Sequence, residues 1–287
     1  MARWWNGLGL CVGLFAGAIL VLGGTSTGFA HAITVDGSAS DWTGSAPSQI
    51  HDASYSNGEW IYKGESGDSR TDPVDPSDSN FDLTEVRLTA DATNLYVLVR
   101  FADVLATDQV YVGLGIDRDQ STTDTSMNFQ GDDSGLTYGN VAAKLPEFIV
   151  DIHNATPGVT TVEMYADNGS SWYAPPTHSE FISTTNDLLE AAIPLSSLGL
   201  TSSSTFGFSL ATFDNGKTSD PSGTAYNNDD DTTVDYPGND ALDCIGGTVG
   251  TSQSSWDRDL SDNNLGNQFT VSIATMVPVA LSSFLVD

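Results

Sequence analysis

The residues most able to do chemistry in this sequence are carboxylates clustered between apolar segments. Asp117, Asp119 and Asp124 follow an apolar run at short spacing, with Ser121 between them. Ca²⁺ binds six to eight hard oxygen atoms, and a D-x-D-x-S loop can supply three of them from one turn. The loop is not an EF-hand, because its sixth position is Thr122 rather than glycine. The spacing predicts a Ca²⁺ site, with a solvated acidic turn as the alternative.

A second group of carboxylates precedes another apolar alternation. The metal ligands predicted from this group are Asp68, Asp72 and Asp82, with Arg70 as an internal counter-charge. Asp82 begins a predicted strand, which fixes its backbone. A third acidic run, residues 229–231, is predicted to be mostly solvated, because consecutive carboxylates cannot all face one ion.

Catalytic chemistry has weaker support. A glycosidase needs two acids on opposite sides of its substrate, one with a raised pKa in an apolar pocket. Nearly all acids here lie in polar loops, and the exceptions in predicted strands are Glu147, Glu163 and Glu190. The sequence contains no G-x-S-x-G motif and no H-x-x-x-H or C-x-x-C spacing. Neither nucleophilic catalysis nor a zinc site is therefore expected.

The elements that would position these carboxylates follow from the apolar pattern. Apolar residues alternate over short stretches separated by Ser, Thr, Asp, Asn and Gly, which is typical of β-strands. Strands are predicted over residues 33–35, 60–62, 84–90, 95–101, 109–116, 147–153, 159–166, 188–194, 206–213 and 268–274. A single helical turn is predicted over 194–200, and a β-hairpin turn over 90–94. Long loops are predicted over 65–81, 117–144 and 214–240. The predicted fold class is all-β: an antiparallel, jelly-roll-like β-sandwich with long acidic loops.

The first 32 residues have the features of a secretory signal peptide. Arg3 supplies the positive charge, residues 8–22 are nearly all apolar or small, and residues 30–32 fit the A-x-A cleavage rule. An uncleaved membrane anchor is the alternative. The mature chain would begin at Ile33 and be secreted, either extracellular or on the cell surface. Its β-sandwich module is expected over 33–274, while 275–287 would form a C-terminal strand or begin a further segment.

The strong negative charge limits which partners the chain could bind. The chain has 38 acidic and 9 basic residues, for a formal net charge of −29 at pH 7. A chain with this charge repels nucleic acid and anionic lipid. Nucleic acid is therefore not an expected partner, and neither is a membrane once the signal peptide has been cleaved. The same charge attracts divalent cations, although an acidic surface for solubility is an equal alternative. Cys244 is the only cysteine after the signal and is expected to be a buried, inert thiol.

Several short motifs occur in a characteristic order. They are Ile33-Thr34-Val35-Asp36-Gly37 with Asp41-Trp42, then Asp82-Leu83-Thr84-Glu85, Asn94-Leu95-Tyr96, Gly115-Ile116-Asp117-Arg118-Asp119 and the run from Tyr236 to Asp243. In this order the sequence resembles the secreted β-sandwich modules related to carbohydrate-binding family 9, the glucodextranase C-terminal domain and the DOMON superfamily. The resemblance covers roughly residues 33–274. It implies a β-sandwich whose partner is a polysaccharide or cell-surface glycan.

Aromatic residues are the expected glycan contacts, because sugars stack their C–H faces on aromatic rings in concave sites. The predicted ligand-binding residues are Trp172, Tyr173 and Trp60, with packing as the alternative. Trp42 is expected to seal one end of the sandwich.

Some DOMON relatives hold haem b with Met plus His or Lys. The candidates here are Met127, Met164, His153 and Lys144. A satisfied histidine at a strand end is favoured for His153, so haem is not expected. The leading hypothesis is an exported, non-catalytic, Ca²⁺-stabilised module for carbohydrate binding or surface attachment. The alternatives are a polysaccharide-active enzyme, or an accessory domain of one, and a haem-binding electron-transfer module.

Overall fold

The computed structural model describes residues 32–69, 82–105, 107, 110–120, 146–156, 159–166, 174–213, 241–252 and 268–276. Structural statements below refer to these ranges. The predicted signal peptide, apart from Ala32, lies outside them, as do residues 277–287 of the predicted C-terminal segment.

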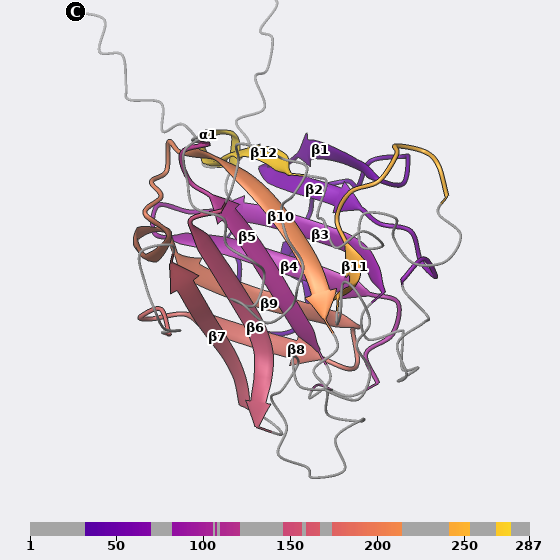
Figure 1. The fold of residues 1–287 in the computed structure, drawn as a ribbon, viewed down its shortest axis with the longest axis horizontal. Coiled ribbons are helices and arrows are strands. Elements are labelled where there is room, and N and C mark those ends of the chain that lie inside the picture. The colour runs from indigo at the N-terminus through magenta and orange to yellow at the C-terminus, as the bar shows by residue number, and fades with distance from the viewer. Residues whose placement is uncertain are drawn as a thin grey trace, which may run out of the picture.

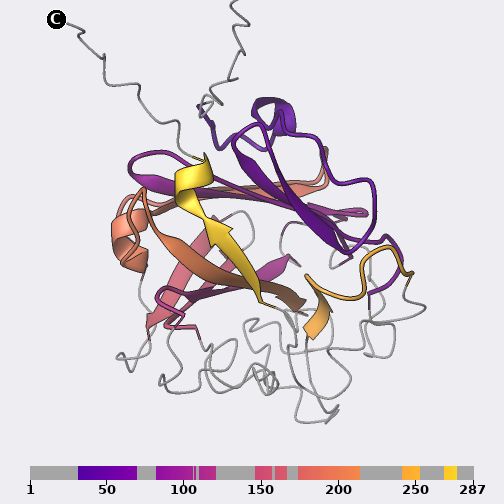
Figure 2. The ribbon, with the colours of Figure 1, turned by 90° about the horizontal axis from the view of Figure 1, so that it is seen from above.

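Two antiparallel sheets pack face to face (Figure 1). The first sheet has the strand order β1 (Asp52–Ser56), β2 (Glu59–Lys63), β3 (Leu83–Ala90), β4 (Asn94–Phe101), β9 (Leu188–Pro194) and β8 (Ser179–Ser183). The second has the order β11 (Ala241–Cys244), β10 (Thr205–Phe213), β5 (Tyr111–Asp117), β6 (Phe148–Thr156) and β7 (Val159–Ala166), and β12 (Phe269–Ser272) also pairs with β10. Figure 2 shows the sheets as two layers. The predicted all-β antiparallel sandwich is confirmed.

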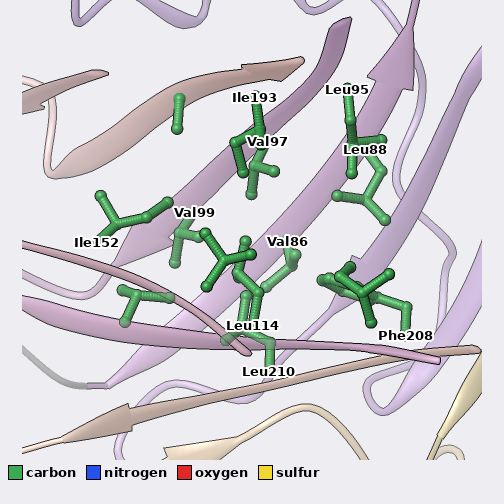
Figure 3. Close-up of a cluster of buried hydrophobic side chains, with 14 of the residues drawn as sticks. Val86, Leu88, Leu95, Val97, Val99, Leu114, Ile152, Ile193, Phe208 and Leu210 are labelled. Carbon is green, nitrogen blue, oxygen red and sulfur yellow. The ribbon is translucent and has the colours of Figure 1, made fainter. Parts of the chain in front are cut away.

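Alternating apolar side chains from both sheets form the core between the layers. Val86 on β3 and Val97 and Val99 on β4 point inward from the first sheet, and Leu114 on β5 and Leu210 on β10 come from the second (Figure 3). All five side chains have no exposed surface. Burying one such side chain contributes about 1.5–3 kcal/mol to the free energy of folding. Because side chains alternate between the two faces of a strand, apolar residues at every second position favour these strands.

Several predicted elements match the structure closely. The hairpin of β3 and β4 is confirmed, with Ala90 paired to Leu95 across the turn. The predicted helical turn is a 3-10 helix, η4 (Leu195–Leu198), which ends at Gly199 in the left-handed region with φ 62°. A second 3-10 turn, η1 (Ala39–Asp41), lies near the N-terminus. Cys244 is a buried free thiol, as expected.

The predictions differ from the structure at both ends of the domain. Residues 33–35 form no strand. The last part of the predicted strand 268–274 turns instead into a short helix, α1 (Ile273–Met276), whose Ile273 and Met276 are buried. None of the helices in the described ranges is long and apolar enough to cross a membrane.

The N-terminal segment covers the outer face of the first sheet. Glu190 on β9 is fully buried there and accepts hydrogen bonds from the backbone N–H groups of Asp36 (3.1 Å) and Gly37 (2.7 Å). The indole Nε1 of Trp42 donates to the same carboxylate at 2.8 Å. Trp42 packs on Leu98 and Leu188 in a small apolar cluster separate from the main core. The motif that resembles the opening of family modules therefore anchors this segment to the sheet.

Candidate metal centres

Two clusters of potential metal ligands lie at the edges of the sandwich. The loop cluster consists of two overlapping groups, His51–Glu65–Asp68 and Asp68–Asp82–Asp243, and the ligand atoms within each group lie within 4.8 Å of one another. It contains the predicted ligands Asp68 and Asp82. The structure adds His51, Glu65 and Asp243, which the sequence did not suggest because no recognisable spacing connects them.

The ligands of the loop cluster lie within a strand or in the segments that precede or connect strands. His51 precedes β1, Glu65 and Asp68 follow β2, Asp82 precedes β3, and Asp243 lies in β11 of the opposite sheet. All but Glu65 are buried. The cluster therefore joins both sheets along one edge of the sandwich.

Backbone N–H groups hold two of these carboxylates in place. Asp82 Oδ2 accepts a hydrogen bond from Gly67 N at 2.7 Å. Asp243 accepts hydrogen bonds from Leu83 N (2.6 Å) through Oδ2 and from Cys244 N (2.7 Å) through Oδ1. These hydrogen bonds fix the positions of both carboxylates within the loop cluster.

The strand-end cluster consists of Asp117, Asp119 and Glu147, whose ligand atoms also lie within 4.8 Å of one another. Asp117 ends β5 and Glu147 directly precedes β6, so pairing of these neighbouring strands brings them together. Asp117 and Glu147 are buried and Asp119 is exposed. Asp117 and Asp119 were predicted from spacing, and Glu147 was considered only as a possible catalytic acid.

Within the strand-end cluster, the buried carboxylate of Glu147 has few groups that could stabilise its negative charge. Its Oε2 accepts a hydrogen bond from Arg118 N at 2.6 Å, whereas its Oε1 is buried with no hydrogen-bond partner among the described residues. The Arg118 guanidinium lies over the Phe148 ring, 5.6 Å from its centroid, and forms no described ion pair with Glu147. The pKa of Glu147 is raised to about 7, chiefly by burial of the carboxyl group. The hydrogen bond from Arg118 N lowers this pKa, and the nearby charges of Asp119 and Asp117 add to the rise.

Other buried acids show how this fold satisfies a carboxylate. Glu59 has no exposed surface and accepts hydrogen bonds from Thr43 N (2.7 Å) and Gly44 N (2.8 Å). Its other oxygen accepts one from Arg87 at 2.8 Å. Glu190, which the sequence offered as a possible catalytic acid, likewise accepts hydrogen bonds from three donors. These two residues are structural anchors, in contrast to Glu147.

The structure corrects one predicted ligand contact. Trp60 is only 3% exposed and points into the core between the sheets. Its indole packs edge-on against Phe208, with ring centroids 5.6 Å apart, and against Phe269, at 5.4 Å. A sugar-stacking ring needs an open face, so the prediction that Trp60 contacts a glycan is wrong.

The remaining predicted contacts, Asp72, Asp124, Trp172 and Tyr173, lie outside the described residues. So do Met127 and Lys144 among the haem candidates. His153 and Met164 lie on opposite faces of the second sheet: Met164 belongs to the core, while His153 stacks on Tyr111 on the outer face. These two side chains cannot ligate the same iron.

Comparison with known proteins identifies no family for this chain. A scan against models of protein families finds no match. A search of curated proteins also finds none. The resemblance to carbohydrate-binding modules thus stays an expectation from the motifs.

The pKa of Glu147 predicts a pH dependence in protein kept metal-free with a chelator. The ordinary value of 4.5 is raised to about 7 in the folded state. The folded state therefore binds this proton more tightly than the unfolded chain. The associated stability is fully present below pH 4.5 and is lost as the pH rises toward 7. Urea unfolding across this range should show the fall, and Glu147→Gln should flatten it.

The exposed residue Asp103 provides the control. Asp103→Asn removes one carboxylate outside both clusters and should leave the slope of stability against pH unchanged. An identical slope in wild type and Glu147→Gln would contradict the proposed environment of Glu147.

Proposed function

We propose that this protein is an exported, non-catalytic β-sandwich module that is stabilised by Ca²⁺ and acts in carbohydrate binding or attachment to a cell surface. The observation that carries the Ca²⁺ part is the strand-end cluster, in which Glu147 presents a buried oxygen with no described hydrogen-bond partner beside two further carboxylates. A bound cation would compensate this oxygen and so offset the burial, and the smaller repulsion from Asp119 and Asp117, that raise the pKa of Glu147.

The donor chemistry favours Ca²⁺ at this cluster. All three side chains offer carboxylate oxygens, the hard ligands that Ca²⁺ prefers. Asp119 is exposed, which leaves room for water to complete the six to eight oxygens that Ca²⁺ takes. An ion here would fasten the end of β5 to the start of β6. Binding energy would thereby become folding energy.

The carbohydrate part of the proposal is supported by sequence features. The predicted signal peptide, the order of the family-like motifs and the aromatic pair Trp172 and Tyr173 all favour an exported glycan-binding module. The strong negative charge argues against nucleic acid and anionic membranes as partners.

A second candidate, a polysaccharide-active enzyme, is favoured by one observation. Glu147 has the raised pKa of a general acid and lies beside two other carboxylates. A glycosidase pair, however, must flank a sugar, while Glu147 and Asp117 are 2% and 0% exposed. A small cation fits such a site better than a sugar ring does, so we favour the non-catalytic function.

Ca²⁺ should raise the melting temperature more than NaCl at matched ionic strength. A cation that binds only the folded state contributes about 2.7 kcal/mol when present at a hundredfold excess over its dissociation constant. Monovalent salt only screens repulsion between carboxylates. Glu147→Gln should lose a large part of the Ca²⁺ increment and should be no less stable than wild type in chelator, because it removes a buried charge. Differential scanning calorimetry measures all of these values.

The exposed-site variant Asp103→Asn should keep the full Ca²⁺ increment. Equal stabilisation of the wild type by Ca²⁺ and by matched NaCl would mean that the carboxylates are only a screened surface.

Glycan binding is tested separately on an array of polysaccharides. Replacing Trp172 and Tyr173 together by Ala should weaken retention by about 1–3 kcal/mol, the scale of losing aromatic contacts, with little change in melting temperature. Assays for released reducing sugar on the same polysaccharides test the enzyme alternative. Unchanged retention in the double variant would show that this pair is not the binding platform, and hydrolysis that Glu147→Gln abolishes would favour the enzyme.

A further inference from the structure

We propose that His51, Glu65 and Asp68 form a binding site for a divalent transition metal of the Zn²⁺ type, separate from the Ca²⁺ site proposed at Glu147. The two sites share no residue.

The hydrogen bonds of Tyr62 determine which nitrogen carries the proton in the neutral His51 ring. The Tyr62 hydroxyl oxygen lies 2.6 Å from Gly246 O, a separation that requires a hydrogen between the two oxygens, so the hydroxyl donates its only proton there. The same oxygen accepts a hydrogen bond from Gly246 N at 2.9 Å. His51 Nδ1, 3.0 Å from this oxygen, must therefore be the donor in their contact. In the neutral ring, Nε2 then carries the lone pair.

This lone pair faces carboxylate oxygens. Nε2 lies 3.7 Å from Glu65 Oε2 and 3.8 Å from Asp68 Oδ2. The His51 side chain is 2% exposed, and its Nε2 has no hydrogen-bond partner among the described residues. A buried acceptor nitrogen without a described hydrogen-bond partner thus faces two carboxylate oxygens. A cation placed between the three atoms would be coordinated by all of them.

The separations suit a small metal ion. Zn²⁺ lies about 2.0–2.2 Å from imidazole nitrogen and carboxylate oxygen, so neighbouring tetrahedral ligand atoms are about 3.4 Å apart. The observed 3.7 and 3.8 Å would shorten to this value with slight side-chain movement. A donor set of one imidazole and two carboxylates favours metals of borderline softness over Ca²⁺, which prefers oxygen alone.

Neighbouring residues orient these ligands through hydrogen bonds, as residues around the ligands do in known metal sites. The hydrogen bond from Nδ1 to Tyr62 fixes the orientation of the ring and leaves Nε2 for the metal. The backbone of His51 has φ 56°, a conformation that histidine tolerates better than most residues, and its N–H donates to Lys63 O at 2.7 Å. The turn between Glu65 and Asp68 is anchored by the bond from Gly67 N to Asp82.

A protonated His51 is the competing explanation. An imidazolium would pair with Glu65 and Asp68 without any metal, and both ring nitrogens would then carry protons. The two states differ at one atom, Nε2, which is protonated in the ion pair and metal-bound in the site proposed here.

The test is Zn²⁺ binding by the full chain in excess Ca²⁺, followed by isothermal titration calorimetry. Wild type should bind one Zn²⁺ at this site. His51→Gln should weaken that binding by more than the roughly 10–100-fold that losing an outer-shell partner costs. His178→Gln removes a histidine outside both clusters and should bind Zn²⁺ as wild type does. Glu147→Gln should also keep Zn²⁺ binding, which separates failure of this site from failure of the Ca²⁺ proposal.

Long-range ¹H–¹⁵N spectra of the histidine rings in wild type give a readout that does not depend on a variant folding. At neutral pH, His51 should show a protonated Nδ1 and an unprotonated Nε2, and Zn²⁺ should shift Nε2 selectively. Two protonated ring nitrogens that Zn²⁺ leaves unchanged, or Zn²⁺ affinity that is equal in wild type and His51→Gln, would overturn the proposal.

Discussion

Burial of carboxylates is the constraint on which the rest of this structure depends. The chain has 38 acidic residues and only 9 basic ones. Within the described ranges, the buried acids are Glu59, Asp68, Asp82, Asp117, Glu147, Asp151, Glu190 and Asp243. An ionised carboxylate removed from water costs several kcal/mol unless hydrogen bonds or a cation compensate it. With so few lysines and arginines, most of that compensation must come from elsewhere.

Hydrogen bonds stabilise the negative charge of several of these buried carboxylates. Over the first sheet, Glu190 and Glu59 gather backbone N–H groups of the N-terminal segment and so hold that segment against the strands. On the second sheet, Asp151 accepts a hydrogen bond from the Tyr111 hydroxyl at 2.7 Å. At the two clusters the acids instead converge on one another, and Glu147 Oε1 and His51 Nε2 are left without described hydrogen-bond partners. The proposed cations would compensate these two atoms, and an ion at the strand-end cluster would reinforce the pairing of β5 with β6.

The strands were the predictable part of the fold. Apolar alternation predicts β3 and β4, and the expected bounds of β3, β4 and β9 lie within one residue of those observed. β1 and β8 were missed because they lie at the two edges of the first sheet, where the apolar alternation is weak. No residue of β1 is fully buried, and only the last two residues of β8 are. Trp60 was misassigned because an alternating strand does not reveal from sequence alone which of its faces meets the core.

The ligand sets were only half predictable. Asp117 and Asp119 share one turn, so local spacing could suggest them. Glu147 reaches them only through pairing of β5 with β6, although its position just before a predicted strand is a signal that could have found it. His51 and Asp243 join the loop cluster through tertiary contacts that leave no spacing in the sequence. Residues that reach a site only through strand pairing, or from the opposite sheet, can be identified only after the sheet topology is known.

A crystal structure of the protein grown with Ca²⁺, with the ion identified by its anomalous scattering, tests the central claim most directly. We expect a calcium ion about 2.3–2.6 Å from Glu147 Oε1 and coordinated by Asp117. A Glu147 carboxyl group that is well ordered at saturating Ca²⁺, with no ion beside it and Oε1 hydrogen-bonded to water or to another residue, would contradict the claim that a cation compensates this buried acid.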